Sequence, residues 1–293
     1  MKPWLFCVIV LLLTGCGPQR EPISASIIQE SDAHCDRISS AHADFWSSHD
    51  TDLFGEVYTE DIIHDDSGTI EGAGDVSGMA STVFLFFPGL QTRATSLFIA
   101  GEECLGVYEY FPLELGGYEF TEEDPLIEID LLRPREDRIF YWGLFESHET
   151  IKKQFLDNEG YQRLEADRRL LEAYAEAWSS TEIDRIAELY TSEAARKDLT
   201  FAEQQSGIDE IRSFAGSFFK LNPGIAWELQ MPFSGDLSGM QVAGGTFLIN
   251  TEKENSGDCV IEAAVLLWKS GQEILEEAIF YNANSLIACG WAK

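Results

Sequence analysis

Basic residues are scarce in this chain of 293 residues. Lysine and arginine number 20 against 51 aspartates and glutamates, which gives a formal net charge of −31 at pH 7. Such an excess of acid repels the phosphates of nucleic acids and the anionic headgroups of lipids. We therefore exclude nucleic acid as a partner. The acids are dispersed and the hydrophobic share of 45% is that of a folded protein, so we expect a strongly solvated surface.

Several motifs of enzymes and metalloproteins are absent as well. The sequence has no Cys-x-x-Cys pair, no metal-ligand spacing of His and Cys, and no GxSxG, HExxH or phosphate-loop pattern. The stretch GAGDVSG at 72–78 spaces its glycines as GxGxxxG, which does not fit the GxGxxG of dinucleotide-binding loops. We therefore expect neither a metal nor a cofactor.

Long apolar runs are lacking except at residues 4–13, and that run is too short to span a bilayer. The four residues at its end, Leu13-Thr14-Gly15-Cys16, resemble the lipobox of bacterial lipoproteins. The resemblance implies a signal peptide at 1–15, a lipid on Cys16, and anchoring in the bacterial cell envelope. Gly17 implies the outer membrane where the cell has one. An ordinary secretory signal with a chance cysteine is the alternative.

Of the six cysteines, one leaves with the expected signal peptide and one is the expected lipidation site. The other four are Cys35, Cys104, Cys259 and Cys289. In an exported protein they allow three disulfide connectivities. Because two fall in each half of the chain, we favour Cys35 with Cys104 and Cys259 with Cys289. Buried free thiols are the alternative.

One sequence pattern occurs twice in the chain. ADFWSSHDTDLFGEVYTEDIIHDD at 43–66 is similar to AEAWSSTEIDRIAELYTSEAARKD at 175–198. Later pairs such as Pro88 and Pro223 keep nearly the same separation, so a small insertion accounts for the difference. A period this long matches a whole domain. We therefore predict tandem domains at 33–158 and 159–293, with a linker at 16–32.

The order of elements is predicted to be the same in both copies. Leu171, Tyr174 and Trp178 follow the i, i+3, i+7 spacing of one helical face, and further helices are predicted at 183–190 and from Asp209 to before Asn222. Hairpins are predicted at 126–146 and 259–281, where runs of apolar and β-branched residues flank a turn. Helices followed by an antiparallel sheet indicate an α+β fold.

This order resembles the nuclear transport factor two-like superfamily, the cystatin-like α+β barrels, which include SnoaL-like polyketide cyclases and ketosteroid isomerases. The resembling segments are YAEAWSSTEIDRIAELYTSEAARKDLT, DEIRSF and VLLWKSGQEILEEAIFY. They cover nearly all of 165–285 and, less closely, 35–150. The resemblance implies two tandem cone-shaped α+β barrels. Each has three helices on a curved antiparallel sheet and a pocket at its open end.

The resemblance also implies a catalytic pair. In ketosteroid isomerase-like members a tyrosine on the first helix donates to the substrate oxyanion and an aspartate after the next strand moves the proton. Tyr174 and Asp198 stand at those places, although a core tyrosine and a capping or solvated aspartate are the alternatives. The second oxyanion donor of the family falls nearest Ala264, with Glu262 two residues earlier, so the set is incomplete.

In the first copy the equivalents are His42 and Asp66. His64 with Asp65 or Asp66 could form a general base held by its neighbour, or be merely solvated. A metal site there is disfavoured because adjacent residues of an extended segment point to opposite faces. His64 corresponds to Arg196, so the two copies would not share one reaction.

Aromatic residues could line the two cones or fill ordinary cores. The candidates for ligand contact are Trp46, Tyr58, Trp142, Trp178, Tyr190, Trp268 and Tyr281.

Three functions fit these observations. The leading hypothesis is a lipid-anchored envelope protein whose two pockets bind a small, largely apolar molecule without catalysis. The second is an isomerase, cyclase or dehydratase acting on a carbonyl compound through Tyr174 and Asp198, or through His64 and Asp66. The third is a scaffold for protein contacts in which the two domains pack on each other across their sheets.

Overall fold

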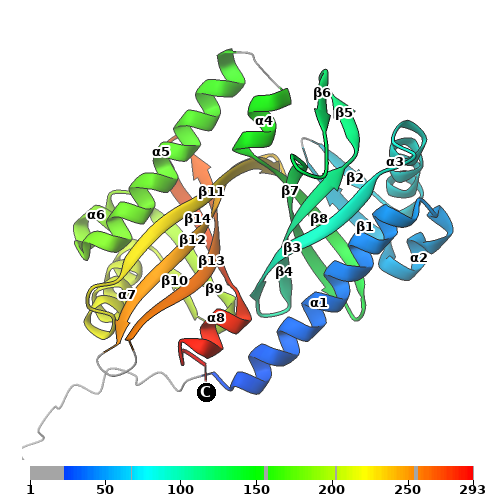
Figure 1. Cartoon of the computed structure of the whole chain (residues 1–293). Helices are drawn as coiled ribbons and strands as arrows, with labels where there is room; N and C mark the ends of the chain where they lie inside the picture. Colours follow the sequence, from blue (N-terminus) through cyan, green and yellow to red (C-terminus); the bar gives the residue numbers. More distant parts are fainter. Residues whose placement is uncertain (1–22, 67, 155–157, 202, 254–256, 293) are drawn as a thin grey trace, which may run out of the picture.

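The computed structural model describes residues 23–66, 68–154, 158–201, 203–253 and 257–292. The chain has an α+β fold with a large, curved, mostly antiparallel sheet and helices outside it (Figure 1). The expected signal peptide, Cys16 and the start of the expected linker lie outside the described residues. Among the described residues, no helix combines the length and apolar character needed to cross a membrane.

The first half, residues 25–147, alternates helices with strands before its long strands begin. Its elements are α1 (Ala25–Ser48), η1 (Thr51–Leu53), α2 (Phe54–Val57), β1 (Tyr58–Asp65), β2 (Thr69–Glu71), α3 (Ala73–Phe86), β3 (Gln91–Ala100), β4 (Glu103–Phe111), β5 (Leu113–Leu115), β6 (Tyr118–Phe120), β7 (Leu126–Arg135) and β8 (Arg138–Ser147).

The second half, residues 158–281, follows the same order after the short helix α4 (His148–Gln154). Its elements are α5 (Asn158–Ser180), α6 (Ile183–Ala187), β9 (Tyr190–Asp198), η2 (Leu199–Phe201), β10 (Glu203–Ser206), α7 (Ile208–Leu221), β11 (Ala226–Leu237), β12 (Met240–Lys253), β13 (Gly257–Ser270) and β14 (Glu273–Tyr281), and α8 (Ala283–Ala288) follows.

Local sequence explains where several helices begin and end. Ser24 caps α1 by accepting the backbone N–H of Ser26, so this helix begins inside the range 16–32 that we expected to be a linker. Helix α7 ends before Asn222, as predicted from the helix-breaking Asn222-Pro223-Gly224 sequence. The predicted hairpins correspond to β7–β8 and β13–β14, which pair antiparallel.

Apart from β5 and β6, which form a separate two-stranded sheet, the strands of both halves belong to one continuous sheet. Its order is β10-β9-β14-β13-β12-β11-β8-β7-β4-β3, and β1 pairs with β8. The halves meet where β11 pairs with β8 and where Tyr281 of β14 pairs with Ile99 of β3. Strands β1 and β9 run parallel to β8 and β14, the last long strand of each half.

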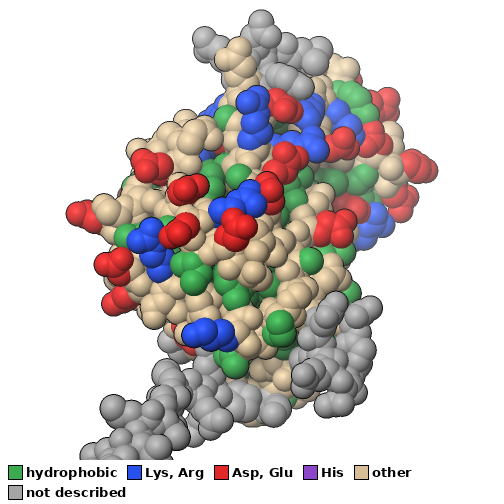
Figure 2. All heavy atoms as spheres, turned by 90° about the vertical axis from the view of Figure 1, so that its left-hand side faces the viewer, with side chains coloured by type: hydrophobic (Ala, Val, Ile, Leu, Met, Phe, Trp, Pro, Cys, Tyr) green, Lys and Arg blue, Asp and Glu red, His purple; other side chains and the backbone are tan. Residues whose placement is uncertain are grey.

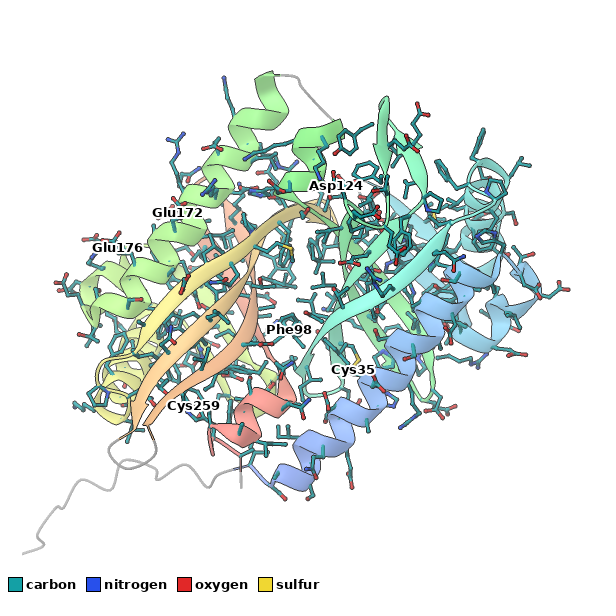
Figure 3. The ribbon with its side chains drawn as sticks, in the orientation of Figure 1. Cys35, Phe98, Asp124, Glu172, Glu176 and Cys259 are labelled. Atoms are coloured by element: carbon teal, nitrogen blue, oxygen red, sulfur yellow. A yellow bond between two sulfur atoms is a disulfide. The ribbon has the colours of Figure 1, made fainter. Side chains whose placement is uncertain are left out.

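Two groups of buried side chains lie on opposite faces of the sheet. The larger lies under the helices of both halves and includes Phe45 and Trp178. The smaller lies between the two portions of the sheet, where Figure 3 shows Phe98. Each long strand contributes to this smaller group, which includes Phe98, Leu105, Ile129, Phe145, Phe233, Val242, Leu266 and Phe280.

Alternation along the strands decides which group a side chain joins. On β8, Tyr141 and Phe145 face the inter-sheet group, whereas Trp142 and Leu144 face the helix side. A glycine makes room in the inter-sheet group, because a Cβ at Gly244 would lie 2.0 Å from the ring of Phe233.

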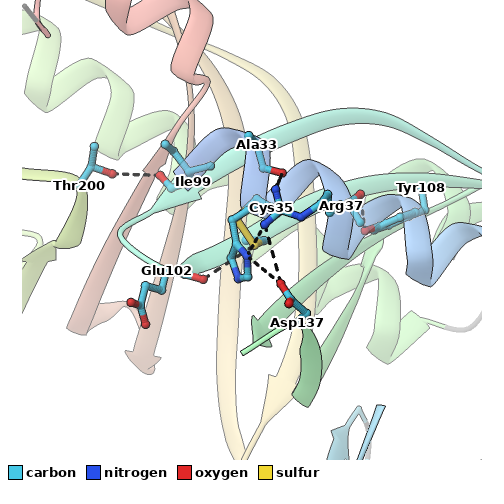
Figure 4. Close-up of a disulfide and its surroundings, with 11 residues drawn as sticks. Ala33, Cys35, Arg37, Ile99, Glu102, Tyr108, Asp137 and Thr200 are labelled. Atoms are coloured by element: carbon cyan, nitrogen blue, oxygen red, sulfur yellow. Dashed lines mark hydrogen bonds and ion pairs between the residues drawn. A yellow bond between two sulfur atoms is a disulfide. The ribbon is translucent and has the colours of Figure 1, made fainter. Parts of the chain in front are cut away.

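Two disulfides fix helical segments to the sheet. Cys35 of α1 is bonded to Cys104 of β4, as Figure 4 shows, and Cys259 of β13 is bonded to Cys289 after α8. These are the pairings favoured by the distribution of the cysteines. In the same region Thr200 of the second half donates to the carbonyl of Ile99 of the first half at 3.0 Å.

Acidic and basic side chains are interspersed on the face that carries α5 and α6, without a large patch of one sign (Figure 2). Arg168 and Glu172 form an exposed i, i+4 pair on this surface. Exposed pairs of this kind stabilise a helix only slightly, so this face is solvated rather than held together by charge.

Candidate functional site

The interior of each half is the region between its helices and its part of the sheet, and we call these regions the first and the second interior. The strand register allows the two interiors to be compared residue by residue. In the parallel pair β1–β8, His64 lies opposite Trp142, and in the parallel pair β9–β14, Arg196 lies opposite Glu277. These pairs occupy the same place in the element order of each half. His64 therefore corresponds to Arg196, and Trp142 corresponds to Glu277.

Glu277 is the centre of the second interior and is fully buried. Tyr174 of α5 donates to its Oε1 at 3.1 Å, Tyr190 of β9 donates to its Oε2, and Arg196 Nε lies 3.0 Å from Oε1. Burial, and then the charge of Glu277, raise the pKa of both tyrosines, so their hydroxyls stay protonated and act as donors.

Asp198 is the second acid of this interior and is also engaged by protein groups. Its Oδ2 accepts the hydroxyl of Tyr281 at 2.9 Å, and its Oδ1 accepts the backbone N–H of Phe201 at 3.3 Å. Arg196 Nη2 lies 4.0 Å from it. Tyr174 and Asp198, the pair implied by the resemblance, are thus each bonded to other partners inside one network.

Arg196 fills the middle of the second interior. Its guanidinium lies 4.2 Å from the ring centre of Phe214 and 5.4 Å from that of Trp178, which is cation–π geometry. Burial opposes its charge, but Glu277 and Asp198 raise its pKa above the ordinary value. The cavity beside it is about 10 Å³, which is room for one water at most.

His42 of α1 takes the place of Tyr174 in the first interior and is fully buried. Its Nε2 lies 3.1 Å from Asp130 Oδ2, and its Nδ1 lies 2.8 Å from the hydroxyl of Tyr58. Tyr110 donates to the same Asp130 oxygen at 3.4 Å. One ring nitrogen of His42 thus faces a carboxylate and the other faces a phenol hydroxyl.

Several buried polar atoms of the first interior have no hydrogen-bond partner among the described residues. They include Nδ1 of His64, Oδ1 of Asp130 and the indole nitrogens of Trp46 and Trp142. His64 is 4% exposed, and its ring centre lies 4.0 Å from that of Trp142. Burial lowers the pKa of His64, so its imidazole is neutral at pH 7.

Three further carboxylates of the first half, those of Asp66, Glu128 and Glu146, are half-buried. Glu128 lies two residues before Asp130 on β7, on the same face, and pairs across the strands with Glu146 of β8. Burial, and then the charges of Asp130, Glu146 and Asp66, raise the pKa of Glu128 well above its ordinary value. Burial, and then Asp66, raise the pKa of Glu146 to about 7.

Several residues named from the sequence lie elsewhere. Asp65 points away from His64 and accepts the hydroxyl of Tyr141 at 3.0 Å and the backbone N–H of Ser238 at 2.7 Å, which connects the two halves. Trp268 and Ala264 belong to the inter-sheet group, and Glu262 is exposed. The other aromatic candidates lie in the larger group, with Trp46, Tyr58 and Trp142 in the first interior and Trp178, Tyr190 and Tyr281 in the second.

The acids of the first interior do not form a metal site. Within the described ranges, no group of three His, Cys, Asp or Glu side chains is placed to hold a metal ion.

Sequence reasoning missed the three acids at the centres of the interiors. Glu277 lies on a strand that also carries the exposed Glu273 and the half-exposed Glu276, and β7 carries no acids besides Glu128 and Asp130. The only signal was an acid at an inward position of a strand. That signal becomes readable only when the register of the pairing is known.

The solved structures found to be similar each cover less than half of the chain. No protein family profile and no curated protein sequence matches it. A solved protein of ketosteroid isomerase-like fold from Catenulispora acidiphila, in complex with trimethylamine, is 15% identical over 42% of this chain and 93% of its own, with a TM-score of 0.37.

Two other solved structures are similar to the same degree. A SnoaL-like polyketide cyclase by name, from Shewanella denitrificans, is 13% identical over 42% of this chain and 94% of its own, with a TM-score of 0.35. An epoxide hydrolase/cyclase-like enzyme of salinomycin pyran ring formation is 14% identical over 41% of this chain and 94% of its own, with a TM-score of 0.36.

Proposed function

We propose that this chain is a non-catalytic binding protein of two tandem cone-shaped domains, 33–158 and 159–293, of nuclear transport factor two-like fold. The first domain holds a small, largely apolar molecule in its interior. The second domain keeps the fold with its interior closed. The observation that carries this proposal is the pair of unpartnered buried atoms, His64 Nδ1 and Asp130 Oδ1.

Buried polar atoms are nearly always hydrogen-bonded, because leaving one unpaired costs about 1–3 kcal/mol. A bound molecule that supplies the missing partners removes this cost. Trp142 packs against His64, Tyr58 and Trp46, and these rings would offer apolar contact to the rest of such a molecule.

The second interior supports the proposal that only the first domain binds a ligand. Its acids Glu277 and Asp198 are each bonded to tyrosines and lie beside Arg196, and the space beside them holds at most one water. Tyr174 and Asp198 are therefore structural in this proposal, because moving either to a substrate would break a buried hydrogen bond.

The test is a ligand screen by melting temperature, since a molecule that binds only the native state stabilises it. We expect a hit that raises the melting temperature of the wild type and has a smaller effect on His64→Phe. The matched control is His34→Phe, because His34 lies on the outer side of α1 near Asp137. Hits that act equally on His64→Phe and the control contradict the proposed site.

One observation favours the catalytic alternative. A carboxyl with a pKa of about 7, as at Glu146, suits general acid–base catalysis at neutral pH. Turnover of a carbonyl compound by the wild type, lost in Glu146→Gln without a fall in melting temperature, would establish an enzyme in place of a binding protein. Loss of turnover in Asp198→Asn would place the activity in the second domain instead.

We further propose that the protein is anchored to a bacterial envelope through a lipid on Cys16. The support is the Leu13-Thr14-Gly15-Cys16 sequence after a short apolar run. Cys16→Ser should abolish the incorporation of labelled fatty acid. The variant should also accumulate as the uncleaved precursor, which has a higher mass. Equal labelling of the wild type and the variant would contradict the anchor.

A further inference from the structure

Two adjoining segments at one end of the molecule carry no charge. The start of α1 contacts α8 there, and Figure 1 shows both elements at the lower end of the view. Residues 23–29 contain no charged side chain, and neither do residues 282–292, which include α8. Because 24% of the residues in the chain are charged and the formal net charge is −31, this surface differs from the rest of the protein. We call residues 23–29 and 282–292 the neutral end.

Acids border the neutral end without entering it. Glu30, the first charged residue of α1, lies one turn beyond Ile27. Glu262 of β13 is exposed, but it alternates with Ile261 and Ala263, which belong to the same core as Leu286 of α8. Glu262 therefore points to the opposite face of the sheet.

Apolar side chains reach the surface within the neutral end. Ile27, in the first turn of α1, is 57% exposed. Ile287 of α8 and Trp291 after it are half-buried, so part of each side chain is accessible. Tryptophan and aliphatic side chains without neighbouring charges are typical of surfaces that rest at the headgroup–acyl boundary of a bilayer.

The proposed lipid anchor is attached close to this end. Cys16 and Ile23 are seven positions apart, and a chain of that length spans at most about 25 Å. A lipid on Cys16 therefore keeps the start of α1 near the bilayer. Anionic headgroups repel the acidic faces of the protein, whereas the neutral end can approach them without this cost.

The most exposed apolar side chains lie elsewhere, at the end of α3. Leu85 and Phe86 are 77% and 71% exposed. They lie at the far end of α1, where the ring of Phe84 stacks on that of His49. Since α1 has 24 residues, this position is about 36 Å from the start of the helix. Contact of both ends with one bilayer would lay α1 along it and bring exposed acids such as Asp36 near the headgroups.

We propose that the neutral end is the membrane-facing surface of the protein, with Ile27, Ile287 and Trp291 in the headgroup region of the bilayer that holds the anchor. This inference rests on the proposed anchor at Cys16 and adds an orientation to it. Helix α1 then leads away from the bilayer, and the acids of both halves stay in water. Burial of the apolar side chains stabilises this orientation, and no charge is taken into the interface.

The test uses the lipidated protein on vesicles of phosphatidylethanolamine and phosphatidylglycerol that contain a lipid with a doxyl quencher near its headgroup. Ser26→Cys and Ser81→Cys, at exposed positions of α1 and α3, are each labelled with a fluorescent thiol reagent. We expect the dye on Ser26→Cys to lose fluorescence and the dye on Ser81→Cys to keep it. The reason is that interfacial side chains lie within about 5–10 Å of the headgroup–acyl boundary.

Ile27→Glu separates contact from mere proximity. Ser24 caps α1, and a glutamate three residues later completes a capping box, so the helix should form as before. The lost apolar contact corresponds to about tenfold in the population of the docked orientation, so quenching of the dye on Ser26→Cys should be largely lost. Leu85→Glu, at an exposed position of α3, is the matched control and should leave this quenching unchanged.

Flotation of the protein with the vesicles reports on the anchor separately. Flotation without quenching of the dye on Ser26→Cys leaves the anchor standing and overturns the neutral end as the contact surface. Quenching on Ser81→Cys that equals or exceeds that on Ser26→Cys has the same meaning, and so does quenching that Ile27→Glu does not reduce. A protein that does not float shows that the anchor is wrong, and the inference with it.

Discussion

At the scale of single residues, the two halves provide different partners for their buried acids. The second half buries Glu277 and Arg196 as an ion pair and satisfies both with tyrosines, Gln205 and Asp198. The first half replaces the tyrosine of the helix with His42 and moves its buried acid to Asp130 on another strand. Corresponding positions therefore carry different chemistry, although the backbone order is shared.

Glu277→Gln tests the buried ion pair. Removing one charge of a buried pair leaves the other uncompensated, so we expect the free energy of unfolding to fall by about 3–5 kcal/mol. Glu276→Gln is the matched control, because Glu276 pairs with Lys197 at the half-exposed surface and such pairs contribute about 1 kcal/mol or less. Urea denaturation measures both. Equal effects would contradict the role of Glu277.

Glu146→Gln tests the acids of the first interior by pH. The pKa of Glu146 is raised from 4.5 in the unfolded chain to about 7 in the folded one, so its contribution to stability is full below pH 4.5 and is lost as pH rises through about 7. The variant should therefore gain stability relative to the wild type between these limits. Urea denaturation at several pH values checks this, with exposed Glu149→Gln as control. A difference that does not change with pH would contradict it.

At the scale of elements, apolar spacing located the helices and the final hairpin of each half. It missed the hairpins β3–β4 and β11–β12, whose strands carry many polar and small residues, and also β5–β6. Strand propensity depends on neighbours in the sheet more than helix propensity depends on tertiary context. The segments that could be predicted were therefore those with a strong local period.

Removing the disulfide between α1 and β4 tests the attachment of that helix. Cys35 and Cys104 are 69 residues apart, and closing a loop of that size stabilises a protein by about 4 kcal/mol. The double variant Cys35→Ala, Cys104→Ala should lose about this amount in urea denaturation without reductant. The wild type with reductant should lose at least as much, since it loses both disulfides. A variant as stable as the wild type would contradict the bond.

At the scale of the whole molecule, the inter-sheet group makes the halves one structure. Side chains from all eight long strands pack between the two portions of the sheet, and Asp65 of β1 holds the β11–β12 turn at Ser238. Folding of one half therefore depends on the other. The continuous sheet is the physical basis for expecting a single cooperative transition.

Phe233→Ala tests this dependence. Phe233 is fully buried in the inter-sheet group, so truncation should cost about 3–5 kcal/mol. We expect the loss to appear in one transition, with tryptophan fluorescence and circular dichroism giving the same midpoint. Two separate transitions, one of them unaffected by the substitution, would show that the halves unfold independently. Met240→Ala, at an exposed position of β12, is the control.

The sequence by itself determined the α+β class, the repeated order of elements and most helix ends, and it favoured the cysteine pairing that the structure has. These depend on short-range periodicity and on where each cysteine falls in the repeat. The tertiary structure alone decided which acids are buried together. His42 and Asp130 are 88 residues apart, and Tyr190 and Glu277 are 87 apart. A one-residue change of strand register would turn each acid to the other face, and no local pattern fixes that register.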